Sequence, residues 1–383
     1  MKIEKIKFNN HKIFDNLEID FKNKEGNVLN TIVIIGENGS GKTTLLKCIY
    51  DSFSIDKLNY DYISENKIEL KSTLYTTIVD ISEVPMLTDS YFQKKIFHFN
   101  EPKIVYMPTE INFEKINKVD NTFKFTPSFQ NIVDQNMTQS IPSLIATKIN
   151  KEIFRNRNKT IGEVIDSVCN NINDIFSIMN LDVKLIGLSE DNETKPIFKN
   201  SLGKEFDITE LSSGEKQLFL RALSLKFLEV NNSIILIDEP EISLHPQWQR
   251  KIINLYESIG ENNQLIIATH SPHVIGNITS DKLRVMVRDN NGIKIVDNDK
   301  LSETYGKGIG DILTTTMNLD SLRNDDITKK LNKVYELLNK NLYDTEEFND
   351  TFNYLRKYLG DLDKDIMRIR LDISIRNRKN AKS

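Results

Sequence analysis

Short apolar runs, several of them alternating with polar residues, dominate the first 110 residues, and this pattern is typical of β-strands. Six such runs occur, at residues 3–8, 16–21, 31–36, 67–81, 94–99 and 103–107. Polar turns rich in asparagine and lysine separate the first three runs. We expect these three runs to form one sheet, which carries the segment that follows residue 36.

The apolar spacing changes to three and four residues in two later regions, which predicts amphipathic helices. The first region, 139–180, contains two helical stretches, and the second of them starts near residue 160. The other region lies beyond residue 300. It contains two apolar stripes, made by Ile327, Leu331, Val334 and Leu338 and by Phe348, Phe352, Leu355 and Leu359.

Two apolar runs in the second half of the chain end in residues that can take part in chemistry. Residues 233–238 end in Asp238, which Glu239 follows, and residues 264–270 end in His270. Apolar runs without alternation are typical of strands that are buried on both faces of a parallel sheet. We therefore expect these polar side chains to stand at the carboxyl edge of such a sheet.

The segment TIVIIGENGSGKTTLL, residues 31–46, runs from an apolar strand through a glycine-rich turn into a helix-forming stretch. Glycines adopt backbone angles closed to other residues, so that successive N–H groups can converge on phosphate oxygens. The lysine of such a loop reaches the β- and γ-phosphates, the next hydroxyl binds Mg²⁺, and the helix N-terminus faces the phosphates. The predicted site for ATP and Mg²⁺ comprises Gly36, Asn38, Gly39, Gly41, Lys42, Thr43 and Thr44.

Hydrolysis of ATP needs a metal ion, an oriented water molecule and stabilisation of charge on the transferred phosphoryl group. Asp238 is expected to hold Mg²⁺ together with Thr43. Glu239 is expected to polarise the attacking water, and His270 to hydrogen-bond the γ-phosphate or that water. The sequence therefore predicts an ATPase with Glu239 and His270 as its catalytic residues.

Composition narrows the class of protein and its possible partners. Of the 383 residues, 39% are hydrophobic and 28% are charged, as in an ordinary soluble globular protein. The net charge of −4 gives no global attraction to nucleic acid, so DNA could bind only at a local patch. The basic end, 368–382, is expected to be a frayed, solvated tail, or else a docking site for DNA or an acidic partner.

Two further features bear on the location of the protein. No apolar run approaches the roughly 18 residues that would span a membrane, so we expect a cytoplasmic protein without a membrane role. Cys48 and Cys169 are too few for a disulfide framework or a zinc site. Both are expected to be buried free thiols in a reducing compartment.

Four motifs together resemble the ABC-type ATPases: GENGSGKT as Walker A, LSSGE as a variant of the LSGGQ signature, ILIDEP as Walker B and ATHSP as the switch histidine. They follow the order of that family and span residues 36–272. The signature also has the spacing of a capping box, so it should begin a helix. The resemblance implies a head-to-tail homodimer, in which Ser213 and Gly214 of one subunit close on the γ-phosphate held by Lys42 of the other. Glu215 belongs to the same predicted nucleotide-binding set.

Within that family, DEPEISLHP and ATHSP resemble the SMC-related group, which includes the overcoming-lysogenization ATPases and ATPases of anti-phage systems. The C-terminal region is similar to that of the Septu-type defence ATPases, at Gly310, Asp311, Ile312, Leu313, Gly360 and Asp363. Thr109 and Glu110 occupy the place of the family's Q-loop glutamine. Neither a Toprim domain nor long coiled-coil arms can be recognised, so we expect the nuclease or other effector to be a separate polypeptide.

We therefore expect an α/β protein: an ABC-type P-loop ATPase head with a mixed α/β insertion and a helical C-terminal region. The expected domains are 1–66 with Walker A, 67–205 as the insertion, 206–300 with the other motifs, and 301–383 as the helical region. Its expected function is to dimerise around ATP and regulate the effector in anti-phage defence. Three alternatives stay open: a DNA-repair ATPase that acts on DNA, the ATP subunit of a transporter, and a protein that uses ATP only to hold an assembly together.

Overall fold

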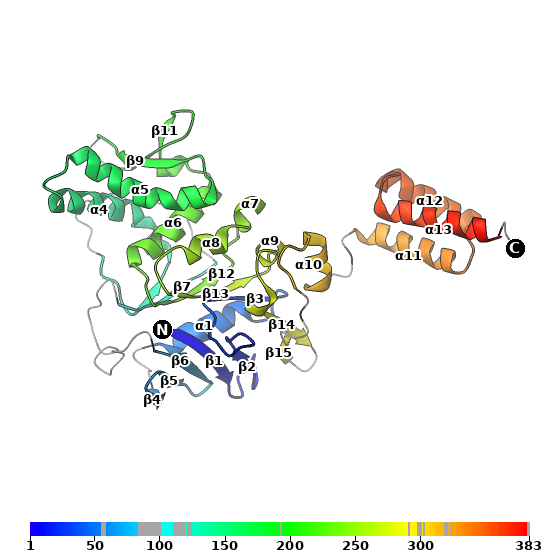
Figure 1. Ribbon diagram of the computed structural model, residues 1–383, viewed down its shortest axis with the longest axis horizontal. Coiled ribbons are helices and arrows are strands. Elements are labelled where there is room, and N and C mark those ends of the chain that lie inside the picture. Colours follow the sequence, from blue (N-terminus) through cyan, green and yellow to red (C-terminus); the bar gives the residue numbers. More distant parts are fainter. Residues whose placement is uncertain are drawn as a thin grey trace. The chain divides into compact units, whose positions relative to one another are not determined.

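The chain divides into two compact units, Met1–Ile312 and Leu313–Ser383 (Figure 1). Each unit has its own hydrophobic core. The computed structural model describes residues 1–54, 59–82, 101–109, 119–120, 125–191, 194–289, 292–296, 301, 303–317, 321 and 323–380. The apolar run expected at 94–99 lies outside these residues. Among them, no helix has both the length and the apolar character needed to cross a membrane.

A seven-stranded sheet with the order β15-β14-β3-β13-β12-β7-β8 lies at the centre of the larger unit. Its strands are β3 (Thr31–Gly36), β7 (Ile104–Met107), β8 (Gln130–Ile132), β12 (Ile234–Asp238), β13 (Gln264–Thr269), β14 (Leu283–Asp289) and β15 (Gly292–Val296). All neighbouring strands are parallel except β14 and β15. The strands β12 and β13 are buried along their whole length, as their unbroken apolar runs predict.

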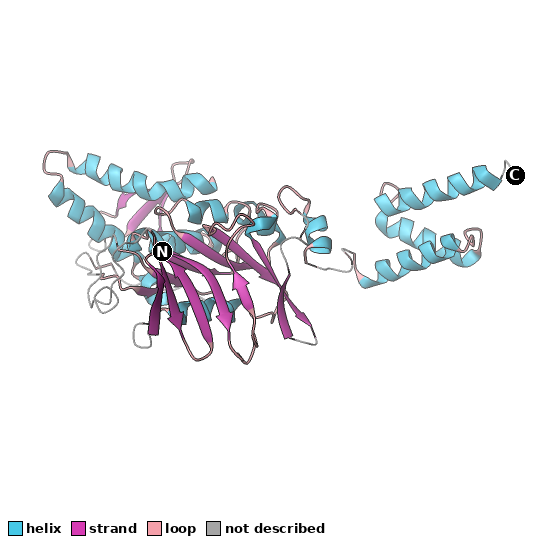
Figure 2. Ribbon diagram, turned by 60° about the horizontal axis from the view of Figure 1, so that its bottom comes forward, coloured by secondary structure: helices cyan, strands magenta, loops and turns pink. Residues whose placement is uncertain are grey.

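A second, antiparallel sheet has the order β2-β1-β6-β5-β4 and comes forward in Figure 2. Its strands are β1 (Lys2–Phe8), β2 (Glu18–Asp20), β4 (Asn59–Ser64), β5 (Lys67–Lys71) and β6 (Tyr75–Asp80). The expectation that the first three apolar runs share one sheet is wrong, because β1 and β2 lie here and β3 lies in the parallel sheet. β1 and β2 mix buried with more exposed residues and cover one face of a core, whereas β3 is buried at every position but its last and needs both faces covered.

Helix α1 (Lys42–Ser52) packs against strands of both sheets. Its side chains Leu45, Leu46 and Ile49 are fully buried in a core that also contains residues of β1, β5, β12 and β13. Cys48 on this helix is a buried free thiol, as predicted, and so is Cys169. Within the expected insertion, β6 pairs with β1 and β7 pairs with β12, so strands of this range join both large sheets.

A helical layer and a small sheet complete the larger unit. The predicted helices between 139 and 180 are confirmed as α4 (Ile141–Arg155) and α5 (Ile161–Met179). The other elements are α3 (Gln135–Gln139), the antiparallel strands β9 (Lys184–Leu188), β10 (Pro196–Lys199) and β11 (Glu205–Asp207), the helices α6 (Ser213–Leu228), α7 (Pro246–Gln249), α8 (Ile252–Glu257) and α9 (Pro272–Ile275), and 3₁₀ turns at Ile208–Glu210 and Ser280–Lys282. Helix α10 (Ile309–Thr315) contains the boundary between the two units, which falls after Ile312.

Three buried aromatic rings join this layer together. Phe176 of α5 stacks on Phe219 of α6 with ring centroids 4.8 Å apart. Phe198 of β10 meets Phe219 edge to face at 5.2 Å. Such aromatic pairs stabilise a core beyond the area that they bury, so Phe219 lies at the centre of this part of the unit.

The smaller unit contains α11 (Asp325–Asn339), α12 (Glu346–Leu359) and α13 (Lys364–Asn380). Both predicted apolar stripes lie in its core, with Leu359 partly buried against it. Arg323 pairs with Asp363 at 2.8 Å and Asp365 at 2.7 Å, which joins the segment before α11 to the start of α13. The expectation of a frayed C-terminal tail is wrong as far as Asn380, because Ile366 and Ile369 anchor α13 in the core.

Replacing Phe219 with alanine is expected to lower the free energy of unfolding of the larger unit by about 3–5 kcal/mol, because it leaves a cavity beside Phe176 and Phe198. The chain has one tryptophan, Trp248, and it belongs to this unit, so its fluorescence during urea denaturation reports the midpoint. Phe154→Ala is the matched control, since that ring is 75% exposed. A Phe219→Ala midpoint equal to that of the control would contradict the packing described.

Candidate functional site

Three neighbouring parallel strands bring the candidate residues to one edge of the seven-stranded sheet. β3 ends at the phosphate loop, β12 ends at Asp238, and β13 lies between them and ends directly before His270. The carboxyl ends of parallel strands share one edge, which is where α/β proteins bind ligands. Thr43 and Asp238, 195 positions apart in the chain, meet there.

The backbone of the phosphate loop needs its glycines. Gly39 and Gly41 have φ angles of 81° and 93°, in the left-handed region that favours glycine. A Cβ on Gly36 would lie 2.5 Å from a carbonyl oxygen of β14. Asn38 is exposed in the loop, and Thr44 is half-buried in the first turn of α1. The loop therefore has the geometry of a backbone cradle for an anion.

Lys42 lies folded back over this loop. Its Nζ donates to the carbonyl oxygens of Gly36 at 2.8 Å and Glu37 at 3.2 Å, and the residue is only 6% exposed. Burial lowers the pKa of Lys42, and the nearby carboxylates Glu239 and Asp238 partly oppose that shift. The ammonium group is therefore poorly solvated and is positioned to exchange backbone carbonyls for phosphate oxygens.

Asp238 has the features of a magnesium ligand. Thr43 Oγ1 donates to Asp238 Oδ2 at 2.8 Å, and Asp238 is 1% exposed. Within the described residues, the other oxygen, Oδ1, is buried without a hydrogen-bond partner. Burial raises the pKa of Asp238, while the hydrogen bond with Thr43 opposes the shift.

These donors fit Mg²⁺ together with a nucleotide. Magnesium is usually held by one or two carboxylates, substrate phosphates and water rather than by a cage of protein ligands. In the described part of the chain, no group of three or more His, Cys, Asp or Glu side chains could hold a metal. Thr43 and Asp238 would therefore supply only part of the coordination, and phosphate oxygens would supply more of it.

Glu239 and His270 meet across the ends of β12 and β13. Glu239 Oε1 lies 3.0 Å from His270 Nδ1, and the two side chains are 20% and 46% exposed. Glu239 has a φ of 44°, which is uncommon for a residue with a side chain, and its N–H donates to Ala268 O at 2.9 Å. This turn leaves both side chains partly open to solvent, where a water molecule can reach them.

A buried hydrogen-bond network holds the loop that carries His270. Glu241 is 4% exposed and accepts hydrogen bonds from the Thr269 hydroxyl and, at 3.3 Å, from the His270 N–H. The Ser271 N–H donates to Thr269 Oγ1 at 3.0 Å, and the Ser271 hydroxyl donates to Gln249 Oε1 at 2.7 Å. The network connects the turn after β12, helix α7 and the turn after β13. Burial raises the pKa of Glu241.

Two buried residues next to this site were not predicted from the sequence. Glu241 was visible only as the second carboxylate of DEPE, and an acidic residue in a turn is usually exposed. Arg221, in the apolar helix α6, is fully buried and donates to the carbonyl oxygens of Pro108 at 2.6 Å and Thr109 at 3.1 Å. The signature helix is thus connected to the end of β7, where the Q-loop was expected. Glu110 lies outside the described residues.

The signature residues form the predicted helix start. The Glu215 N–H donates to Ser212 Oγ at 3.3 Å, and the Ser212 N–H donates to Glu215 Oε2 at 3.0 Å, which completes a capping box. Ser213 is exposed, and a Cβ on Gly214 would lie 2.9 Å from Ser243 O. No hydrogen bond or ion pair found among the described residues joins the signature to the phosphate loop of the same chain.

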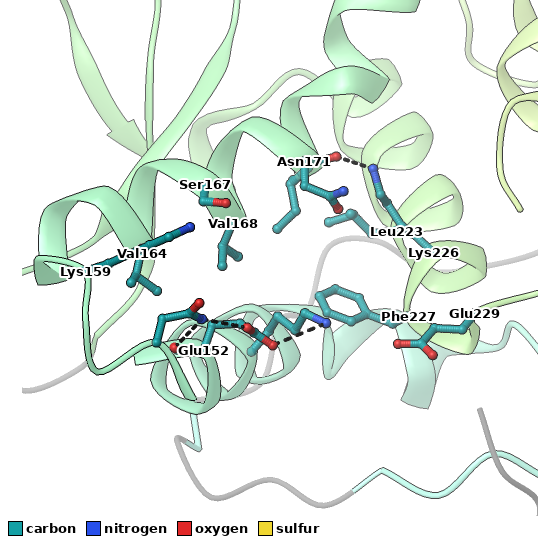
Figure 3. Close-up of a pocket in the computed structure, with 13 residues that line it drawn as sticks. Glu152, Lys159, Val164, Ser167, Val168, Asn171, Leu223, Lys226, Phe227 and Glu229 are labelled. Carbon is teal, nitrogen blue, oxygen red and sulfur yellow. Dashed lines mark hydrogen bonds and ion pairs between the residues drawn. The ribbon is translucent and has the colours of Figure 1, made fainter. Parts of the chain in front are cut away.

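A cavity of about 480 Å³ lies elsewhere, between α4, α5 and α6 (Figure 3). Val168, Leu223 and Phe227 line it together with charged side chains such as Glu152 and Lys226. Burial lowers the pKa of Lys226, which donates to Asn171 O. None of the lining residues belongs to the four motifs, so this cavity is separate from the site at the strand ends.

A family model described as "AAA domain, putative AbiEii toxin, Type IV TA system" matches residues 80–276, more than half of the chain. The chain belongs to this AAA-domain family. It is a P-loop ATPase. The matched range contains the signature, Walker B and switch-histidine motifs, and the phosphate loop precedes it.

Two relatives found by sequence fit the resemblance predicted from the motifs. The Retron Vc95 probable ATPase of Vibrio cholerae serotype O1 biovar El Tor is 22% identical, and the match covers 92% of this chain and 88% of the relative. Septu protein PtuA of Bacillus mycoides (strain KBAB4) is 23% identical over 82% of this chain, but only 44% of PtuA is matched. The predicted resemblance to Septu-type ATPases is confirmed. A solved SMC head bound to the C-winged helix domain of ScpA is 15% identical, covers 77% of this chain and 97% of its own, and has a TM-score of 0.45.

In this AAA-domain ATPase, Glu241→Ala is expected to lower ATP turnover by about tenfold, because it leaves the Thr269 hydroxyl and the His270 N–H without a buried acceptor, at a cost of about 1–3 kcal/mol. Glu241→Gln keeps an acceptor oxygen and the side-chain shape. It should retain most of the turnover, since burial already disfavours the charged form of Glu241. Phosphate release measures turnover, and the melting temperature checks folding. Equal losses in the two variants would contradict a role that rests on hydrogen bonding.

Proposed function

We propose that the chain binds ATP and Mg²⁺, dimerises around the bound nucleotide, hydrolyses it and thereby regulates a separate effector in anti-phage defence. One observation carries the proposal: Lys42, the Thr43–Asp238 pair and the Glu239–His270 pair stand at one edge of one parallel sheet. These groups supply phosphate binding, metal binding and a water-facing base, which are the parts that phosphoryl transfer to water requires.

The phosphate loop would bind the nucleotide through its backbone, with Gly36, Gly39 and Gly41 leaving room for phosphate oxygens. Lys42 would leave its carbonyl partners for the β- and γ-phosphates, while Thr43 and Asp238 would hold Mg²⁺. The ion, when bound, neutralises charge on the transferred phosphoryl group.

Glu239 is the proposed base. Its carboxylate would accept a proton from the attacking water, and such a base typically contributes about 10²–10⁴-fold to the rate. His270 would orient that carboxylate through the contact between Nδ1 and Oε1 and keep its other ring nitrogen for the γ-phosphate. The buried hydrogen-bond network around Glu241 would hold the backbone of His270 in place during hydrolysis.

A second copy of the chain would complete each site. Each chain carries one signature, and no hydrogen bond or ion pair among the described residues joins it to the phosphate loop of the same chain. A head-to-tail homodimer would place Ser213 and Gly214 opposite the other subunit's ATP. Ser213 is exposed, as such a contact needs. The N-terminal end of α6 would also direct its dipole at the γ-phosphate.

The retron and Septu relatives support a defence role for this chain. The proposed effector is a separate nuclease, as the resemblance to Septu-type ATPases implies. A DNA-repair role is the second candidate to test, and it predicts that DNA ends stimulate ATP turnover. A transporter subunit would instead be recovered together with a membrane permease.

Glu239→Gln is expected to lower ATP turnover by about 10²–10⁴-fold, because it removes the base while preserving the binding groups. It should keep ATP bound and hold the chain as a dimer. Lys42→Ala is the matched comparison, which should lose ATP binding and the dimer together. Phosphate release, retained nucleotide and the mass measured by light scattering distinguish the variants. Unchanged turnover in Glu239→Gln would exclude Glu239 as the base.

A further inference from the structure

Helix α13 presents a second apolar surface in addition to the one that anchors it. Ile366 and Ile369 are buried in the core of the smaller unit, and Ile373 packs against that core. Met367, Leu371 and Ile375 follow at four-residue spacing and are 49%, 62% and 46% exposed. Residues at this spacing are neighbours on one side of a helix. The three side chains therefore form a continuous apolar column that does not pack against the core.

Basic side chains flank this column. At 3.6 residues per turn, seven exposed positions fall within about 120° of the helix circumference. We call them the outer face of α13, which comprises Lys364, Met367, Arg368, Leu371, Ser374, Ile375 and Arg378. The outer face contains three cations and no acidic residue.

Among the described residues, the three cations of the outer face differ from most other cations of the smaller unit in their ion pairing. Among the described residues, the cations that form ion pairs in the smaller unit lie elsewhere; they are Arg323, Lys330, Lys333, Lys340, Arg356, Arg370 and Arg376. No ion pair is found for Lys364, Arg368 or Arg378 in the described part of the chain. The acidic residues of α13 are occupied, since Asp365 pairs with Arg323 and Asp372 pairs with Arg376.

An apolar column flanked by cations fits one class of binding partner better than the others. Two outer faces would bring like charges together, which is unfavourable at an interface, so pairing of this face with the same face of a second copy is disfavoured. Membrane-surface helices bury a wide apolar face rich in Trp, Phe and Leu, whereas this column is one side chain wide. Single-stranded nucleic acid stacks its bases on aromatic rings, and the outer face has none. Duplex DNA binds through phosphate contacts to cations, and such contacts would leave the apolar column without a partner.

We propose that the outer face of α13 docks an acidic amphipathic helix of a partner protein. Apolar side chains of the partner would pack against Met367, Leu371 and Ile375, and flanking carboxylates would pair with the three cations, as charges flank the apolar seam of a coiled coil. The identification of this partner as the effector rests on the proposed function.

The surface is tested with the full-length chain and a defined probe. The probe is a fluorescent helical peptide with leucine at every fourth position and glutamate on both sides, compared with a peptide that has lysine in place of glutamate. The outer-face variants are Leu371→Ser and the double variant Arg368→Glu with Arg378→Glu. The matched controls are Leu362→Ser, at a side chain that is 88% exposed outside the outer face, and Lys329→Glu, at an exposed lysine of α11.

The glutamate peptide should bind, and its dissociation constant measured by anisotropy should rise about tenfold or more in both outer-face variants and stay unchanged in both controls. The lysine peptide should not bind. Equal binding to outer-face and control variants, or equal binding of the two peptides, would overturn the proposal. So would an outer face that binds duplex DNA, anionic vesicles or a second copy in place of the glutamate peptide.

ATP turnover separates this inference from the proposed function. The outer-face variants should hydrolyse ATP at the rate of the unchanged chain. If peptide binding behaves as expected while Glu239→Gln leaves turnover unchanged, the docking surface stands and the proposed function fails. If Glu239→Gln abolishes turnover while the peptide binds all variants equally, the proposed function stands and the docking surface fails.

In cells, a photo-crosslinking residue at position 371 should capture a partner through an acidic helical segment, and capture through a basic segment would count against the proposal.

Discussion

The contact between Thr43 and Asp238 is the constraint on which the rest of the ATPase site depends. It joins the first turn of α1 to the end of β12 across 195 positions of sequence, and it does so around a carboxylate that is 1% exposed. A buried polar atom without a partner costs about 1–3 kcal/mol, and Asp238 Oδ1 is such an atom within the described residues. A bound cation would remove that cost. The site is therefore less stable without its ligands than a fully paired one would be.

The parallel sheet makes this contact possible. With β13 placed between β3 and β12, the phosphate loop, His270 and Asp238 lie at adjacent strand ends. Two buried side chains connect this edge of the sheet to neighbouring elements. Glu241 holds the loop of His270, and Arg221 connects the signature helix to the end of β7. A movement of the signature helix would thus reach the edge of the sheet through packed and hydrogen-bonded groups, which transmit small shifts because interiors are close-packed.

Local patterns in the sequence predicted local features well. The glycine spacing predicted the loop, the unbroken apolar runs predicted β12 and β13, and Ser212 with Glu215 predicted the helix start. Each of these depends on residues close together in the chain.

Long-range partners could not be predicted in the same way. Which sheet β1 and β2 join depends on strands far along the sequence, and the burial of Glu241 depends on Thr269, 28 positions away. The C-terminal helix was mistaken for a tail because its charges outnumber its apolar residues. The anchoring of Ile366 and Ile369 became visible only once α11 and α12 were folded against it.

Mixing two inactive chains tests most directly whether two subunits share each ATP site. One chain carries Lys42→Ala, and the other carries Ser213→Arg. Because Ser213 is exposed, this substitution should leave the hydrophobic core of its chain intact. A dimer with one chain of each kind contains one site in which an intact Lys42 faces an intact Ser213. If two subunits share each site, each variant alone is inactive and the mixture hydrolyses ATP. A mixture as inactive as its parts, or full turnover by Ser213→Arg alone, would contradict a shared site.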